Sequence, residues 1–125
     1  IPDRVLVFTG AFLLAVVCAL TLAAAAHSKP RCRTGACTLR VWHRHQRLVV
    51  APYRVWLPRL ARCESGGNYA TNTGNGFHGA FQFDLRTWRS VGGRGFPHRA
   101  GRLEQQYRAV LLRRQRGTSP WPVCG

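Results

Sequence analysis

Only four carboxylic acids occur in this 125-residue chain, and they are Asp3, Glu64, Asp84 and Glu104. Glu64 is the strongest candidate for acid catalysis, because aromatic residues that can exclude water from it follow along the chain: Tyr69, Phe77, Phe81 and Trp88. A carboxyl group in an apolar setting has a raised pKa and can donate a proton at neutral pH. We therefore predict that Glu64 is a general acid. The alternative is a surface carboxylate paired with one of the many arginines.

A short helix is expected to position Glu64. Pro58 suits the first turn of a helix, where the N–H that proline lacks has no partner within the helix. The glycine pair that follows Ser65 should end this helix. Residues at helical spacing share one of its faces, namely Leu57, Leu60 and Cys63. Glu64 then lies in the last turn, where the negative end of the helix dipole disfavours ionisation.

Turn-forming residues separate Glu64 from two further predicted helices. Residues 68–79 are rich in Asn, Thr and Gly and predict an irregular hairpin or loop. Asp84 stands at the N-cap of a helix over residues 85–91. Apolar spacing predicts a last helix over residues 102–116 that ends at Gly117, with a core stripe of Leu103, Tyr107, Val110 and Leu111. We expect its arginines to face solvent, and Glu104 to form an ion pair with Arg108 at i,i+4.

The cysteines predict a disulfide framework. One of the five lies in the N-terminal apolar run, and the other four are Cys32, Cys37, Cys63 and Cys124. An even set fits an oxidising compartment. Among the three connectivities, we favour Cys63–Cys124 together with Cys32–Cys37. We expect neither a metal nor an organic cofactor, the alternative being a zinc site made by Cys32 and Cys37 with His43 and His45.

The N-terminal part predicts export. Residues 5–26 form an uncharged apolar run that ends in three alanines, which is typical of a secretory signal peptide. The run is also long enough to be an uncleaved membrane anchor. The predicted organisation is a signal peptide or anchor at residues 1–26, a polybasic connector at 27–56 and a compact domain at 57–125. We expect the connector to be poorly ordered, apart from a short strand at residues 48–51.

The charge is extreme, with 19 Lys and Arg residues against four acids and a net charge of +15 at pH 7. Such a field attracts polyanions. A basic nucleic-acid-binding or membrane-active protein is therefore a rival interpretation. The export signal and the absence of a recognised binding motif argue against a specific nucleic-acid partner.

Five blocks of sequence follow one another from Cys63 onward. They are Cys63–Tyr69, Asn72–Phe77, Gly79–Phe83, Thr87-Trp88 with Gly92-Gly93, and Trp121–Cys124. In this order and spacing, residues 57–125 resemble the catalytic domain of the resuscitation-promoting factors of high-GC Gram-positive bacteria. The final Trp-Pro-Val-Cys block makes the resemblance specific, since a lone Glu-Ser-Gly-Gly is common.

The resemblance implies a small lysozyme-like fold, α+β but mainly helical, with a Cys63–Cys124 disulfide. It implies action on the glycan strands of peptidoglycan, with Glu64 as the catalytic acid. By the family's motifs, six residues line the pocket and the glycan groove: Thr73, Gln82, Trp88, Asn68, Tyr69 and Phe77. The chain departs from the family in Phe77 and His78, where tyrosines are common, and in a last helix that is unusually rich in arginine.

The number of carboxylates decides between two reactions. Cleavage of the β-1,4 bond between N-acetylmuramic acid and N-acetylglucosamine needs a proton on the leaving oxygen. A lysozyme-type hydrolase would use Asp84 beside Glu64, but we favour Asp84 as a helix N-cap. A lytic transglycosylase needs one carboxyl group, because a hydroxyl of the substrate itself attacks and gives a 1,6-anhydro product. The scarcity of acids favours this route. A wall-binding module without activity is the remaining alternative.

Further expectations concern partners and exposure. We expect a secreted or cell-wall-associated monomer, with a role in growth or resuscitation that only the resemblance implies. Anionic wall polymers and a peptidoglycan endopeptidase are additional candidate partners. We expect Trp88 and Trp121 each to bury one face, and His78 and His98 to lie at the surface.

Overall fold

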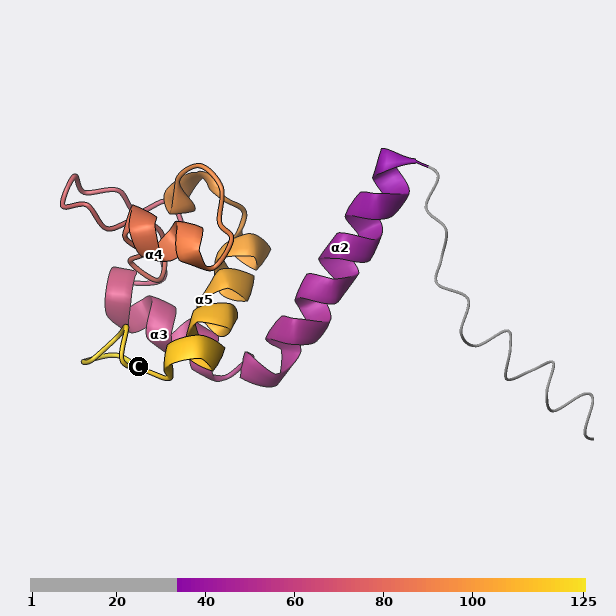
Figure 1. Cartoon of the computed structure of the whole chain (residues 1–125). Coiled ribbons are helices and arrows are strands. Elements are labelled where there is room, and N and C mark those ends of the chain that lie inside the picture. The colour runs from indigo at the N-terminus through magenta and orange to yellow at the C-terminus, as the bar shows by residue number, and fades with distance from the viewer. Residues whose placement is uncertain (1–33) are drawn as a thin grey trace, which may run out of the picture. The chain divides into compact units, whose positions relative to one another are not determined.

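A long helix occupies the segment predicted to be a polybasic connector. The structure is a computed structural model that describes residues 34–125, and its first helix, α2, spans Gly35–Val50 (Figure 1). Thr34 caps this helix, because its Oγ1 accepts a hydrogen bond from the backbone N–H of Cys37 at 3.3 Å. The expectation of a poorly ordered connector is therefore wrong for this stretch, and so is the strand expected at residues 48–51.

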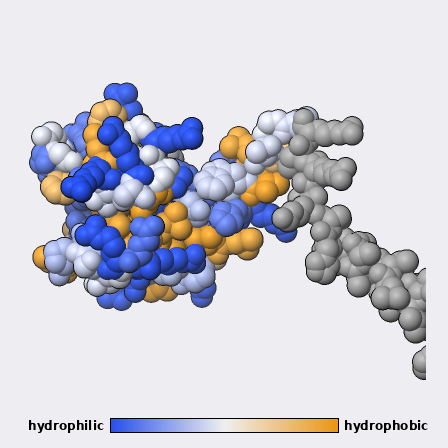
Figure 2. Space-filling view, in the orientation of Figure 1, coloured by the Kyte–Doolittle hydropathy of each residue, from blue (hydrophilic) through white to orange (hydrophobic). Residues whose placement is uncertain are grey.

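Helix α2 is held in place by α5 (Arg102–Arg116). Gln46 is only 1% exposed, and its Nε2 donates a hydrogen bond to the Glu104 carboxylate. The Trp42 ring meets the Tyr107 ring edge to face, with centroids 5.3 Å apart. Such packing, more than intrinsic propensity, stabilises most helices in proteins. Hydrophobic residues remain exposed elsewhere on α2 (Figure 2), among them Leu39, Val41 and Leu48.

The other elements follow the predicted order. They are the 3₁₀ turn η1 (Ala51–Tyr53), α3 (Trp56–Ser65), α4 (Leu85–Ser90), the 3₁₀ turn η2 (Pro97–Arg99) and then α5. The helices predicted beyond residue 57 are confirmed, with small differences at their ends. Gly66 ends α3 in the left-handed conformation, at a φ of 65°, which glycine adopts without strain.

The segment between α3 and α4 is an irregular loop, as predicted. Within residues 34–125, β pairing is limited to two isolated antiparallel bridges, in which His78 pairs with Asn72 and with Phe83. The described chain is thus mainly helical, and the predicted small lysozyme-like fold is confirmed.

The core lies where α3, α4 and α5 meet the loop. Its most deeply buried side chains include Leu57, Leu60, Phe81, Trp88 and Val110, each at most 1% exposed. The Trp88 ring packs edge to face against Phe83, with centroids 5.2 Å apart. A Cβ at Gly93 would lie 2.2 Å from Cε2 of Trp88, so only glycine lets the chain pass this ring.

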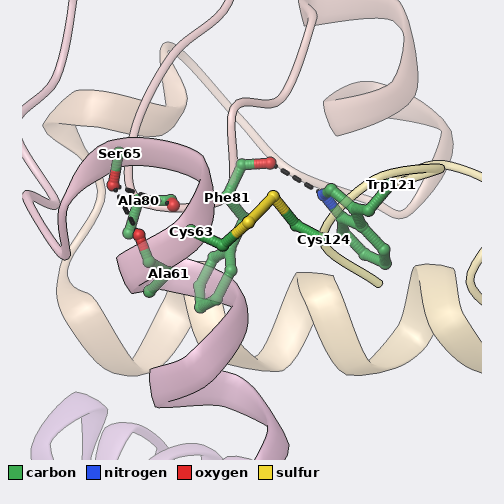
Figure 3. The surroundings of a disulfide bond; sticks show 7 residues. All are labelled: Ala61, Cys63, Ser65, Ala80, Phe81, Trp121 and Cys124. Atoms are coloured by element: carbon green, nitrogen blue, oxygen red, sulfur yellow. Dashed lines mark hydrogen bonds between the residues drawn. A yellow bond between two sulfur atoms is a disulfide. The ribbon is translucent and has the colours of Figure 1, made fainter.

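A disulfide between Cys63 and Cys124 joins the last turn of α3 to the C-terminal tail (Figure 3). The two Cα atoms lie 5.7 Å apart and 61 residues apart in sequence. Closing a loop of this length stabilises the fold by about 4 kcal/mol in the chain-entropy model. The Trp121 indole N–H also donates to the Phe81 carbonyl oxygen at 2.9 Å. The predicted pairing is confirmed, and two bonds anchor the tail to the body.

The predicted ion pair between Glu104 and Arg108 is also confirmed, at 2.6 Å. Arg108 does not face solvent as expected, because Nη1 donates to the Val91 carbonyl oxygen at 2.5 Å and only 13% of its side chain is exposed. Glu104 accepts from Gln46 as well, so this carboxylate joins α2 to α5. It is a structural acid with no carboxyl oxygen free for chemistry.

Some predictions fall on residues 1–33, which lie outside the described part of the chain. They are the predicted export segment and the predicted disulfide between Cys32 and Cys37. Cys37 is disulfide-bonded, so it offers no thiolate to the alternative zinc site. In residues 34–125 there is no group of three His, Cys, Asp or Glu side chains suited to a metal ion. No helix in the same range is both long and apolar enough to cross a membrane.

Candidate active site

Glu64 lies in the last turn of α3, between two anchored neighbours. Cys63 before it carries the disulfide to the tail. Ser65 after it has its Oγ 3.1 Å from the Ala61 carbonyl oxygen and 3.0 Å from the Ala80 carbonyl oxygen, so the hydroxyl can donate to either (Figure 3). The backbone that carries Glu64 is therefore fixed to the tail on one side and to the loop on the other.

The Glu64 side chain lines a pocket of about 330 Å³. Phe77 and Gln82 of the loop form one part of its wall, and the tail from Pro120 to Cys124 forms the rest. Partial burial raises the pKa of the Glu64 carboxyl group above its ordinary value. Among the described residues no arginine pairs with this carboxylate, and no side chain or N–H donates to it. The predicted alternative, a surface acid neutralised by an arginine, does not fit this environment.

Two residues of the loop line the pocket beside Glu64. Phe77 is 46% exposed although it is a large hydrophobic residue. Gln82 adopts a positive φ of 49°, which is strained for a residue with a side chain, and its Nε2 donates to the Gly79 carbonyl oxygen at 3.0 Å. Both residues also line the adjoining pocket. The structure thus brings Phe77 and Gln82 together beside Glu64, and their roles in glycan binding stay predictions.

Asp84 caps helix α4, as predicted. Its Oδ1 accepts a hydrogen bond from the Thr87 N–H at 2.9 Å. Burial alone would raise the pKa of Asp84, but hydrogen bonds from Thr87 and from the Arg86 backbone outweigh it, so the pKa lies below its ordinary value. Asp84 lines the adjoining pocket rather than the one that contains Glu64. It is an ionised carboxylate already engaged by the helix that it caps.

Comparison with known proteins agrees with this geometry. Residues 51–124 match the family model of the transglycosylase-like domain. The chain is 35% identical over 120 residues to the resuscitation-promoting factor RpfD of Mycobacterium tuberculosis, a match that covers 84% of this chain and 75% of that protein. The chain belongs to the resuscitation-promoting factor family.

Matches to other family members are shorter but have a higher sequence identity. The chain is 52% identical over 66 residues to the resuscitation-promoting factor Rpf of Micrococcus luteus, covering 53% of this chain and 30% of that protein. It is 46% identical over 77 residues to RpfE of Mycobacterium tuberculosis, covering 62% of this chain and 45% of that protein. The chain therefore spans less than half the length of these two relatives.

Three other predicted site residues of this family member do not line the three pockets around Glu64 and Asp84. Asn68, Tyr69 and Thr73 line none of them. The Asn68 Oδ1 accepts from the Ala70 N–H at 2.9 Å, within a turn of the loop. The Tyr69 hydroxyl accepts from Nε2 of Gln106 at 3.0 Å. The roles of these three residues in glycan binding stay predictions.

Two expectations about ring side chains are wrong. Trp88 is wholly buried and donates from Nε1 to the Arg94 carbonyl oxygen at 3.2 Å, so it belongs to the core and cannot contact a glycan. His78 is 8% exposed rather than at the surface, because its backbone pairs on both sides and its ring packs against Phe96 and His98.

Two features that shape the site were not predicted from the sequence. The tail residues Pro120–Cys124 form a wall of the Glu64 pocket, and the Trp-Pro-Val-Cys block was the signal for them. Gln105 is wholly buried in α5 and joins three segments: its Oε1 accepts from the Ala80 N–H, and its Nε2 donates to the carbonyl oxygens of Tyr69 and Ala100. No sequence signal marked Gln105 for this role, because it lies on the side of the helix opposite the predicted core stripe.

Proposed function

We propose that this chain cleaves the glycan strands of peptidoglycan as a lytic transglycosylase, with Glu64 as the acid and base. The observation that carries the proposal is the unpaired Glu64 carboxyl group in a largely apolar pocket of a strongly basic protein. A raised pKa keeps a larger fraction of this group protonated, which is what proton donation to a leaving oxygen requires.

One carboxyl group is enough for this reaction, because it first donates a proton and then takes one up. Protonated Glu64 gives its proton to the oxygen of the β-1,4 bond between N-acetylmuramic acid and N-acetylglucosamine, and the bond from that oxygen to the anomeric carbon breaks. The carboxylate then accepts the proton of the C6 hydroxyl of the same muramic acid as its oxygen attacks the anomeric carbon. The product is a 1,6-anhydro sugar, and Glu64 returns to its protonated form.

A lysozyme-type hydrolase is the second candidate. The pKa of Glu64 is raised and that of Asp84 is lowered, and such divergence is typical of an acid working with an ionised carboxylate. Against it stands the hydrogen bond from the Thr87 N–H, which gives Asp84 a role in capping α4. A wall-binding module without activity is the third candidate.

The setting of the reaction is part of the same proposal. We infer that the chain acts outside the cytoplasm, as a secreted or wall-associated monomer, with residues 5–26 as signal peptide or anchor. Anionic wall polymers and a peptidoglycan endopeptidase are proposed partners. A role in growth or resuscitation is proposed from the names of the relatives.

Product analysis tests the reaction. The full chain is incubated with purified peptidoglycan, and the released fragments are analysed by mass spectrometry. We expect muropeptides that end in 1,6-anhydro-N-acetylmuramic acid, which are lighter by one water than the reducing products of a hydrolase. If only reducing ends are found, the chain is a hydrolase and not a transglycosylase. If no fragments are released, a wall-binding module without activity is the remaining candidate.

A further inference from the structure

A series of adjoining pockets extends from Glu64 along the molecule. The pocket that holds Glu64 shares Phe77, Gln82 and Pro120 with a second pocket of about 220 Å³. That pocket in turn shares Asp84, Thr87 and Arg116 with a third, of about 560 Å³. Because each pocket shares lining residues with the next, the three adjoin one another and are together called the groove.

The far end of this groove is basic. Arg86 from α4 and Arg116 from the last turn of α5 line the third pocket, together with Thr87 and Ser90. Within the described residues, neither guanidinium group makes an ion pair or donates a hydrogen bond. Both side chains are exposed and free to bind an anion.

The one acid in this pocket does not neutralise the two arginines. Asp84 accepts hydrogen bonds at the start of α4 and forms no ion pair with Arg86 or Arg116 in the described structure. One carboxylate also leaves a pair of guanidinium groups with a net positive charge. A bound molecule that reaches this end therefore meets unsatisfied donors in a positive field.

The proposed substrate has anionic groups in a suitable place. In a glycan strand that carries its peptides, the lactyl carboxyl group of each muramic acid is bound as an amide to the peptide, so the sugars are uncharged and the free carboxylates are those of the peptide. Guanidinium groups bind carboxylates through paired, charge-assisted hydrogen bonds. The peptide carboxylates are therefore better ligands for Arg86 and Arg116 than the uncharged groups of the sugars.

We propose that Arg86 and Arg116 bind a carboxylate of the peptide carried by a muramic acid in the groove, so that the chain selects strands that still carry their peptides. This inference rests on the proposed function for its substrate class. In this proposal the two arginines determine which strands are bound, whereas Glu64 supplies the proton for cleavage. Selection of this kind places the chain before, rather than after, any enzyme that removes the peptides.

Binding tests this inference independently of cleavage. The affinity of the full chain with the Glu64→Gln substitution is measured for glycan strands that retain their peptides and for strands freed of them by an amidase, with the lactyl carboxylates that the amidase exposes converted to amides. Wall polymers are removed from both. We expect the strands with peptides to bind about tenfold more tightly, as the loss of a charge-assisted hydrogen bond predicts. Adding Arg86→Gln and Arg116→Gln should abolish this preference and leave binding of the bare strands unchanged.

Arg89→Gln is the matched control, because Arg89 is an exposed arginine of the same helix that lines none of the three pockets. It removes the same charge and should preserve the preference. Equal affinity for the two kinds of strand, or an equal loss of affinity on both in the double variant, would overturn the inference. So would a preference that appears only when the wall polymers are left on the strands. If wild-type chain cleaves neither substrate while the preference persists, the proposed activity fails and this inference stands.

Discussion

Cys124 is bonded to Cys63, the residue immediately before Glu64, so the tail that walls the pocket is attached beside the carboxyl group that it covers. On the other side of Glu64, the Ser65 hydroxyl lies within hydrogen-bonding distance of the carbonyl oxygens of Ala61 and Ala80 and holds the backbone there. The disulfide therefore has two effects. It stabilises a small domain, and it keeps the apolar wall that raises the pKa of Glu64.

Replacing Cys124 by serine together with Cys63 by serine should destabilise the domain by about 2–5 kcal/mol, because the 61-residue separation is no longer closed in the unfolded chain. Urea unfolding of the double variant and of wild type measures the difference. At a temperature where the variant is still folded, wall digestion should also fall, since the tail is no longer held against Glu64. Full activity in a folded double variant would show that the tail is not needed at the site.

The pKa of Glu64 predicts how stability changes with pH. Its folded pKa is raised, so the folded state favours the protonated form, and this contribution is fully present below the unfolded pKa. It is lost as the pH rises from the ordinary value of 4.5 through the raised pKa. Glu64→Gln, which cannot ionise, should therefore be more stable than wild type at neutral pH and similar to it at pH 4. Urea unfolding at the two pH values is the measurement, and an unchanged difference between them would contradict the burial of Glu64.

Asp84 separates the two proposed reactions. Asn caps helices about as well as Asp, so Asp84→Asn should preserve stability and activity, whereas Asp84→Ala should cost about 1 kcal/mol of stability. Thermal unfolding and the rate of wall digestion are measured for both variants. Collapse of activity in folded Asp84→Asn would favour the two-carboxylate hydrolase instead.

Phe77 tests the glycan groove. It is largely exposed and lines two of the pockets, so Phe77→Ala should change stability little but weaken binding of glycan strands by about tenfold, through the loss of apolar contact area. Phe77→Tyr keeps the ring, restores the hydroxyl common in the family, and should bind at least as well as wild type. Affinities measured in the Glu64→Gln background separate binding from cleavage. Normal binding by Phe77→Ala would place the glycan elsewhere.

The sequence predicted the helices around the site because their ends carry strong local signals. Gly66 after α3, Asp84 before α4 and Gly117 after α5 each act within one turn of the chain. Phe77 and Gln82 came from the family's motifs, and both line the Glu64 pocket, whereas their contact with a glycan stays a prediction. These features depend on neighbours in sequence or on a shared pattern, so they could be predicted from the chain alone.

What the sequence did not predict depends on contacts between distant segments. Helix α2 looked like a solvated basic segment, although Trp42, Gln46 and Val49 recur at helical spacing, because its partner α5 was not known. Trp88 was assigned to the Glu64 pocket by the family's motifs, but helix α4 turns the ring toward Gly93 and into the core. The arginines that end the groove come from α4 and α5, and only the fold brings them together.

The central claim is that the carboxyl group of Glu64 supplies the proton for glycan cleavage, and digestion of purified cell walls by Glu64→Gln tests it most directly. Glutamine has nearly the same shape and cannot donate that proton, so we expect release of soluble fragments to fall by at least about a hundredfold, in line with the contribution of general acid catalysis. Binding to the walls should persist, which shows that the variant is folded. Wall digestion at the wild-type rate by Glu64→Gln would contradict the account.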